Sequence, residues 1–83
     1  MEFTAKVFVT LKEEVNDPQG RTVLQGLKRL GFESIHSVRV GKYLVLQLEA
    51  QDAKVAEIEA VKMCQQLLVN PVIESSNIEI TKH

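Results

Sequence analysis

Apolar and polar side chains alternate along residues 3–11, and this period of two constrains the fold more than any other feature of the chain. One side of the segment carries only apolar residues: Phe3, Ala5, Val7, Val9 and Leu11. The other side carries Thr and Lys side chains, interrupted by one aromatic ring, that of Phe8. Alternation of this kind predicts a β-strand with one face on a core and the other facing outward.

Two helices are predicted from their start and stop signals. Asp17-Pro18 indicates a helix start, because Asp can accept hydrogen bonds from free N–H groups and Pro suits the first helical position. Gly31 is a suitable left-handed stop. The apolar residues between them recur at helical spacing: Val23, Leu24, Leu27 and Leu30. A second helix is predicted from Asp52 to about residue 70, where Pro71 prevents continuation.

Three further strands complete the pattern. Ile35–Val40 and Tyr43–Ala50 read as strands joined at Gly41-Lys42, a dipeptide typical of a tight type II′ hairpin turn. Asn77–Thr81 reads as a short last strand whose isoleucines face inward.

The order strand, helix, strand, strand, helix, strand predicts a single α+β domain over residues 1–83. With right-handed crossovers it is the ferredoxin-like βαββαβ arrangement, a four-stranded antiparallel sheet with both helices on one face. The other face has no helical cover. Phe8, Tyr43 and Val45 fall on that bare face, and we expect them to mediate self-association.

Composition narrows the class of function. A chain of 83 residues forms a small core, and oligomerisation is a common remedy. Lys and Arg number 10 against 11 Asp and Glu, a net charge of −1, which offers no broad footprint for nucleic acid or for a membrane surface. The chain has no apolar run of roughly 20 residues, no basic-then-apolar leader and a single cysteine. We therefore expect a cytoplasmic protein.

Side chains that could carry chemistry are few. Neither His36 nor His83 has a Cys, Ser or Asp context that marks a catalytic site. Cys64 lies among helical apolar positions and reads as a buried thiol. Two weak signals remain: the acidic group Glu13, Glu14 and Asp17, explained as a connector with a helix cap, and Gly20-Arg21, a weak phosphate signal near a helix start. We predict no catalytic, cofactor-binding or metal-binding residue.

Three short strings, taken in order, resemble one known family. They are Asp17-Pro18-Gln19-Gly20, Arg39-Val40-Gly41-Lys42-Tyr43 and Asn70-Pro71-Val72-Ile73-Glu74. Together with the opening strand, they resemble PurS, the small subunit of phosphoribosylformylglycinamidine synthase, over nearly the whole chain. The chain differs from the family pattern at Ser75-Ser76, where an acidic residue and an aromatic are usual.

The resemblance implies a non-catalytic subunit of a ligase complex in purine biosynthesis. A glutaminase subunit releases ammonia, and a large synthetase subunit, which binds ATP and Mg²⁺, uses it on an activated amide. The small subunit, as a homodimer or higher homo-oligomer, bridges the two and supports ammonia transfer. Gln19, Arg39, Lys42 and Glu74 are polar residues beside turns, and we predict that they contact the partner subunits.

Other functions share this predicted fold. A ligand-binding regulatory domain of ACT type has the same architecture and dimerises. An RNA-binding module also uses a βαββαβ sheet with exposed aromatic rings, although the net charge of −1 argues against it. An acylphosphatase-like enzyme is weakly suggested by Gln19-Gly20-Arg21, but no Asn lies at a suitable strand position.

Overall fold

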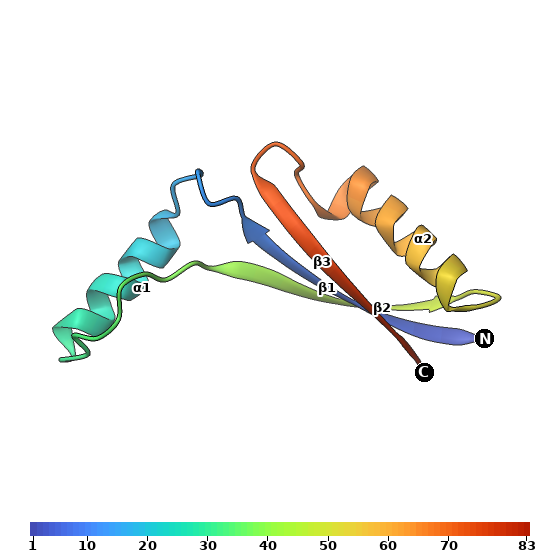
Figure 1. Cartoon of the computed structure of the whole chain (residues 1–83), viewed down its shortest axis with the longest axis horizontal. Helices are drawn as coiled ribbons and strands as arrows, with labels where there is room; N and C mark the ends of the chain where they lie inside the picture. Colours follow the sequence, from blue (N-terminus) through green and yellow to red (C-terminus); the bar gives the residue numbers. More distant parts are fainter.

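A computed structural model describes all 83 residues. Its elements (Figure 1) are β1 (Glu2–Leu11), α1 (Pro18–Arg29), β2 (Gly41–Glu49), α2 (Ala53–Met63), a π-helix η1 (Cys64–Leu68) and β3 (Glu74–Lys82). The strands form one antiparallel sheet in the order β2-β1-β3, so β1 is the central strand. No helix is long and apolar enough to span a membrane.

The core lies between the alternating face of β1 and one side of α2. Phe3, Ala5, Val7 and Val9 are at most 4% exposed, as the period of two predicts. Small residues one helical turn apart bring α2 close to them: Ala56, Ala60 and Cys64 are all buried. Asp52 caps α2 by accepting a 2.9 Å hydrogen bond from the Val55 N–H, as the sequence indicates.

Only three of the four predicted strands are present, and the predicted hairpin is wrong. Residues 35–40 form no strand in this chain, and Gly41 already lies in β2, opposite Thr10 of β1. A type II′ turn needs a positive φ at its first central residue, and Gly31 is the only residue with one. A Cβ on Gly41 would lie 2.3 Å from the Val9 carbonyl oxygen. Gly41 therefore permits close strand pairing instead of a turn.

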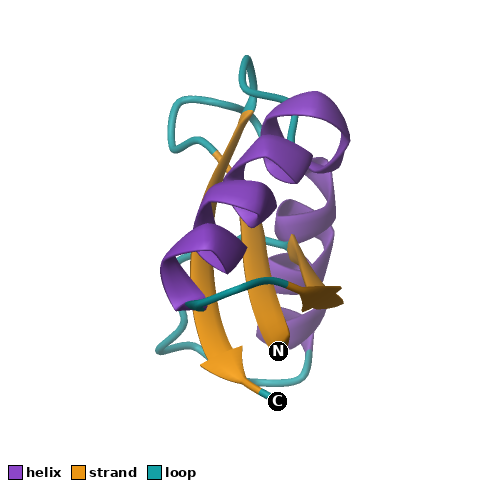
Figure 2. Cartoon of the chain, turned by 90° about the vertical axis from the view of Figure 1, so that its right-hand side faces the viewer, coloured by secondary structure: helices purple, strands orange, loops and turns teal.

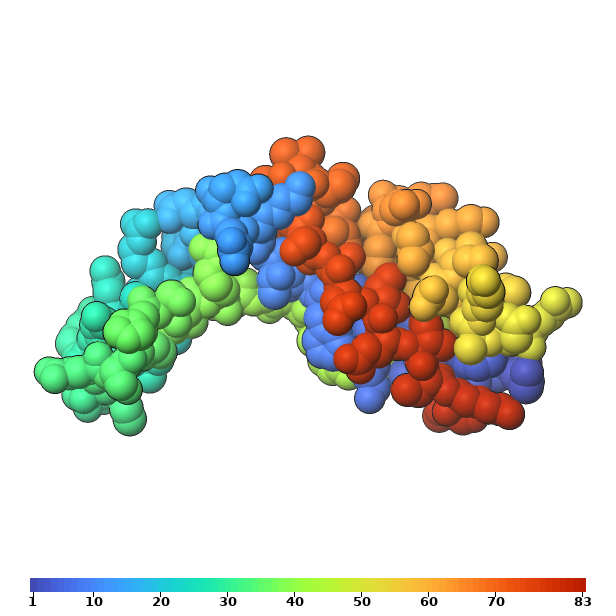
Figure 3. All heavy atoms as spheres, viewed as in Figure 1, coloured from blue at the N-terminus to red at the C-terminus, as the bar shows by residue number.

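Because the hairpin is absent, α1 does not cover the sheet. We call residues 17–40 the arm, and β1, β2, β3, α2 and η1 the sheet body. The arm projects beyond one end of the sheet body (Figures 1 and 3). The radius of gyration is 16.3 Å, against about 12 Å for a compact chain of this length. The prediction of both helices on one face of the sheet does not hold within one chain.

The side view shows how unevenly the sheet is covered (Figure 2). α2 lies against the face that carries Val7 and Val9. On the same face, Leu44, Leu46 and Leu48 of β2 remain half-buried. The opposite face has no helix, and it carries Phe8 and Tyr43 as predicted.

Candidate functional site

The chain crosses between the sheet body and the arm twice, and the two crossings lie side by side (Figure 1). Residues 12–17 lead out to the arm, and residues 38–41 return from it. We call this crossing the neck. Two of the three strings that carry the family resemblance contribute residues to it, and the third contacts it through the Ile73 carbonyl.

Asp17 joins the two crossings. Its carboxylate accepts hydrogen bonds from the Gly20 N–H at 2.9 Å, which caps α1, and from the Val40 N–H at 2.8 Å, on the returning segment. The residue is 6% exposed. The Gly20 and Val40 N–H groups, followed by the nearby Arg39 guanidinium, hold the pKa of this carboxyl below its ordinary value, against the opposing effect of burial. Asp17 therefore stays ionised at neutral pH.

Arg39 holds the same junction from the other side. Its Nη2 donates to the carbonyl oxygen of Lys12 at 2.7 Å and to that of Val15 at 2.8 Å. Both carbonyls belong to the outgoing connector, and that of Lys12 also accepts from the Val15 N–H at 2.9 Å. A guanidinium can donate to both at once. The sequence predicts that Arg39 contacts a partner subunit. Within the chain, the Arg39 side chain connects the returning segment to the outgoing one.

Gly20 allows α1 to approach the returning segment closely. A Cβ at this position would lie 2.1 Å from the carbonyl oxygen of Val38. A backbone atom cannot move aside as the end of a flexible side chain can, so only glycine fits here. At Gly26, on the same helix, a Cβ would meet no atom within 4 Å, so a larger residue has room there.

The third string forms the turn that leads into β3 and meets the neck at its base. The Glu74 carboxylate accepts from the Asn70 N–H at 2.8 Å, and Asn70 Oδ1 accepts from the Val72 N–H at 3.1 Å. The Asn70 N–H and then Lys42, whose Nζ lies 3.5 Å from Glu74 Oε2, lower the pKa of Glu74, against the effect of burial. The Ile73 carbonyl accepts from the Lys12 N–H at 2.9 Å.

The structure thus brings together the four residues predicted to contact partners. Gln19, Lys42 and Glu74 line one cavity of about 180 Å³, with walls from Val9, Leu11, Val40 and Gly41. Arg39 lies beside it on the returning segment. Arg39 and Glu74 accept or donate hydrogen bonds inside the chain, and Lys42 pairs with Glu74. Gln19, Arg39 and Lys42 are exposed. Contact with partner subunits stays a prediction for all four.

The residues predicted to mediate self-association also lie together. The rings of Phe8 and Tyr43 stack with centroids 4.9 Å apart and planes 26° apart. Phe8, Tyr43 and Val45 are 38%, 54% and 50% exposed. They form an exposed apolar patch on the bare face, and self-association through it stays a prediction.

The remaining candidates are scattered. His36 and His83 are both exposed, and Glu13 and Glu14 lie exposed on the connector. Cys64 is buried, and burial raises the pKa of its thiol. No group of three or more His, Cys, Asp or Glu side chains converges as a metal site would require.

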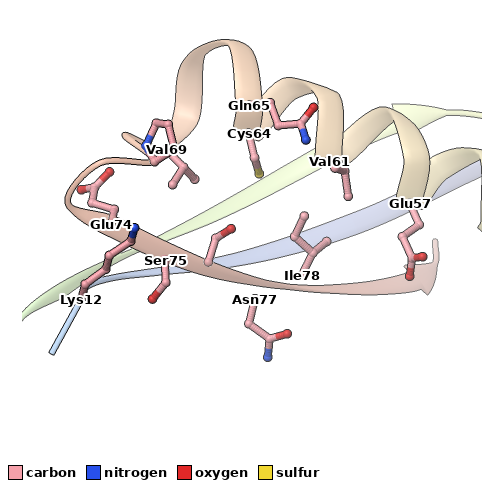
Figure 4. Close-up of a pocket in the computed structure, with 12 residues that line it drawn as sticks. Lys12, Glu57, Val61, Cys64, Gln65, Val69, Glu74, Ser75, Asn77 and Ile78 are labelled. Atoms are coloured by element: carbon pink, nitrogen blue, oxygen red, sulfur yellow. The ribbon is translucent and has the colours of Figure 1, made fainter.

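Sequence reasoning missed a pocket of about 480 Å³ between α2, η1 and β3 (Figure 4). Glu57, Val61 and Gln65 of the helices line one side, and Ser76 and Ile78 of β3 line the other. The periodicity of residues 53–68 cannot distinguish a continuous α-helix from an α-helix that ends in a π-turn. The sequence therefore carried no signal for the pocket that these helices form with β3. The strand itself extends over Ser75-Ser76, which the prediction left outside it.

Comparisons with known proteins agree on one family. The family model described as PurS, phosphoribosylformylglycinamidine (FGAM) synthase, matches residues 4–82. The PurS subunit of Synechocystis sp. is 44% identical over 95% of this chain and 79% of its own length. That of Bacillus subtilis is 38% identical over 94% of this chain and 92% of its own length.

Solved structures give the same result. PurS of Methanocaldococcus jannaschii matches with a TM-score of 0.88 and 32% identity, covering 98% of each chain. A chain in the structure of PurLQS from Thermotoga maritima matches with a TM-score of 0.90 and 30% identity, over 98% of this chain and 99% of that one. The elongated shape described above is therefore shared with solved PurS chains.

Proposed function

The chain belongs to the PurS family of phosphoribosylformylglycinamidine synthase, and we propose that within this enzyme it bridges the glutaminase and synthetase subunits. One observation carries the assignment: the family model matches from residue 4 to residue 82, almost the whole chain. The match to a chain of the Thermotoga PurLQS structure supports membership of a larger assembly. The ACT-type and RNA-binding alternatives have no comparable support.

In the proposal, the chain contributes contacts and no reacting group. Glutamine hydrolysis belongs to the glutaminase subunit, and ATP and Mg²⁺ belong to the synthetase subunit. This chain supports the transfer of ammonia between them, in the cytoplasm. The neck offers Gln19 and Lys42, the two exposed polar residues of the small cavity, for contact with these subunits.

We also propose that two copies exchange their arms. The accessible surface is 6106 Å², whereas a compact chain of this mass exposes about 5,000 Å². An excess on the order of 1,000 Å² is what one partner buries in a specific interface. Much of it is apolar and on the arm, where Val23, Leu30 and Phe32 are 44%, 76% and 58% exposed.

The exchange would supply the missing fourth strand. A hairpin at Gly41 would fold residues 35–40 back along the outer edge of β2; opened out, the same segment reaches β2 of a second copy. That edge is free, because β2 is the last strand of the sheet. α1 of the second copy would then cover the half-buried Leu44, Leu46 and Leu48. The predicted four-stranded sheet with two helices on one face would be completed between chains.

Co-expression of this chain with glutaminase and synthetase subunits tests the bridging function. We expect the three to co-purify in the presence of glutamine and nucleotide. Omission of this chain should abolish glutamine-dependent synthesis while ammonia-dependent synthesis, which does not need the bridge, continues. Equal rates from glutamine with and without this chain would show that the bridging role is wrong.

A further inference from the structure

The outer edge of β3 is a second free edge, which arm exchange would leave open. β3 lies at the opposite end of the sheet from β2, and in Figure 2 no strand lies beyond the one that ends at the C-terminus. The Lys12 N–H donates to the Ile73 carbonyl and the His83 N–H donates to the Glu2 carbonyl. Odd-numbered residues of β3 therefore face β1, and even-numbered ones point their backbone groups outward.

Glu74 is an exception among them, because its N–H donates to the Asn70 carbonyl at 2.8 Å. The outward groups of the other even-numbered residues have no partner in the chain. Neither the backbone nor the side-chain hydrogen bonds outside the regular elements involve Ser76, Ile78, Ile80 or Lys82 as backbone donors or acceptors. The strand has no Pro, no Gly and nine residues. In proteins that do not associate through their sheets, exposed edge strands are usually short, bulged or interrupted by Pro. The β3 edge has none of these protections.

The sequence of β3 is complementary to itself in one antiparallel register. When Ile78 lies opposite Ile78 of a second copy, each residue that follows Ile78 lies opposite the residue that precedes it by the same number of positions. Lys82 then lies opposite Glu74 at both ends of the pair, and Asn77 lies opposite Glu79 on either side of its centre. A shift by one step in one direction places Glu79 opposite Glu79, which repels. The centred register pairs all nine residues and is the one that joins opposite charges.

The pocket beside β3 supports the same arrangement (Figure 4). Glu57, Val61 and Gln65 are spaced four apart, so they form one stripe of the α2 and η1 surface along this edge. Antiparallel pairing of two β3 edges keeps both α2 helices on the same side of the joined sheet. The stripe of each copy would then meet that of the other, with the 38% exposed Val61 at the centre.

We propose that β3 pairs with β3 of a second copy in an antiparallel manner, centred on Ile78. The contact is distinct from arm exchange, since it uses the other edge of the sheet. The β3 contact alone would join two chains, and it would leave the β2 edge of each chain free for arm exchange. The occupant is a second copy because the charges along the edge match those of the same strand reversed.

A disulfide measures this contact directly. Residues 77 and 79 would face each other at a non-hydrogen-bonded position, where Cα atoms lie about 4.5 Å apart, a separation that suits a disulfide. Asn77→Cys/Glu79→Cys should form a covalent two-chain species on mild oxidation, in more than about half of the molecules. Asn77→Cys alone should form little, because its partner position lies two residues away. The buried Cys64 provides the wild-type background.

Charge at residue 77 gives a second readout that leaves the fold intact, since Asn77 is exposed. Asn77→Lys should tighten self-association by roughly threefold to tenfold through attraction to Glu79, and Asn77→Glu should weaken it similarly. Equal association constants by sedimentation for the two variants, or equal crosslinking of the single and double cysteine variants, would overturn the proposal. Val23→Asp, which blocks arm exchange alone, should leave the disulfide unchanged, so the two contacts can fail separately.

Discussion

The sheet body and the arm both carry apolar faces, yet only the sheet body has a core of its own. In the sheet body, Val7 and Val9 are at most 1% exposed beneath α2. In the arm, Val23 of α1 and Leu30 at the C-terminal end of this helix are exposed, and α1 is held by the polar contacts of the neck. The direction of the arm is therefore fixed by hydrogen bonds, but the arm depends on another surface to bury its apolar side.

The same substitution in the two regions should give the largest contrast. Val7→Asp places an unpaired charge in the core and should cost more than about 4 kcal/mol, enough to prevent folding of a small domain. Val23→Asp should leave the circular dichroism of the sheet body intact and shift the mass to that of non-exchanged chains. A folded Val7→Asp, or an unfolded Val23→Asp, would contradict the distinction between a self-sufficient body and a dependent arm.

Substitutions at two glycines of α1 test whether the close approach in the neck stabilises the fold. Gly20→Ala should lower the free energy of unfolding by about 2 kcal/mol, since its Cβ would collide with the Val38 carbonyl. Gly26→Ala is the matched control: its Cβ meets nothing within 4 Å, so better helix propensity should raise stability by up to about 1 kcal/mol. Thermal unfolding measures both. The same sign for both variants would mean that the close approach at Gly20 does not hold the arm.

Acid should release the arm before it unfolds the core, a smaller effect. Backbone N–H groups of Gly20 and Val40 keep the pKa of Asp17 below its ordinary value of 3.8. A lowered carboxyl pKa stabilises the folded state fully above the ordinary value, and this contribution is lost as the pH falls through the lowered one. Hydrogen exchange at the Val40 amide should therefore stay protected at neutral pH and lose protection below about pH 4.

Asp17→Asn provides the control for that measurement. An amide oxygen can still accept from one N–H, but it carries no charge to titrate, so protection at Val40 should be weaker and should not change with acid at this site. If the wild type and Asp17→Asn lose protection in parallel as the pH falls, another group controls the neck.

Local patterns were sufficient for β1, for the starts of both helices and for the division of the sheet into two faces. Alternation places Val7 inward and Phe8 outward whatever the rest of the chain does. Asp17 and Asp52 cap their helices as their position before a helical pattern indicates. The family strings also pointed to residues that meet in space, although not to their contacts with one another.

Three of the strands, the helices and the family to which the chain belongs could be predicted from the sequence, because each follows from neighbouring residues. Whether Gly41 turns the chain or continues a strand could not be predicted in this way. Both are compatible with glycine, and the choice depends on where β1 ends, on the carbonyl of Val9 and on the neck contacts of Asp17 and Arg39. These are interactions between residues more than 20 positions apart, which no local pattern encodes.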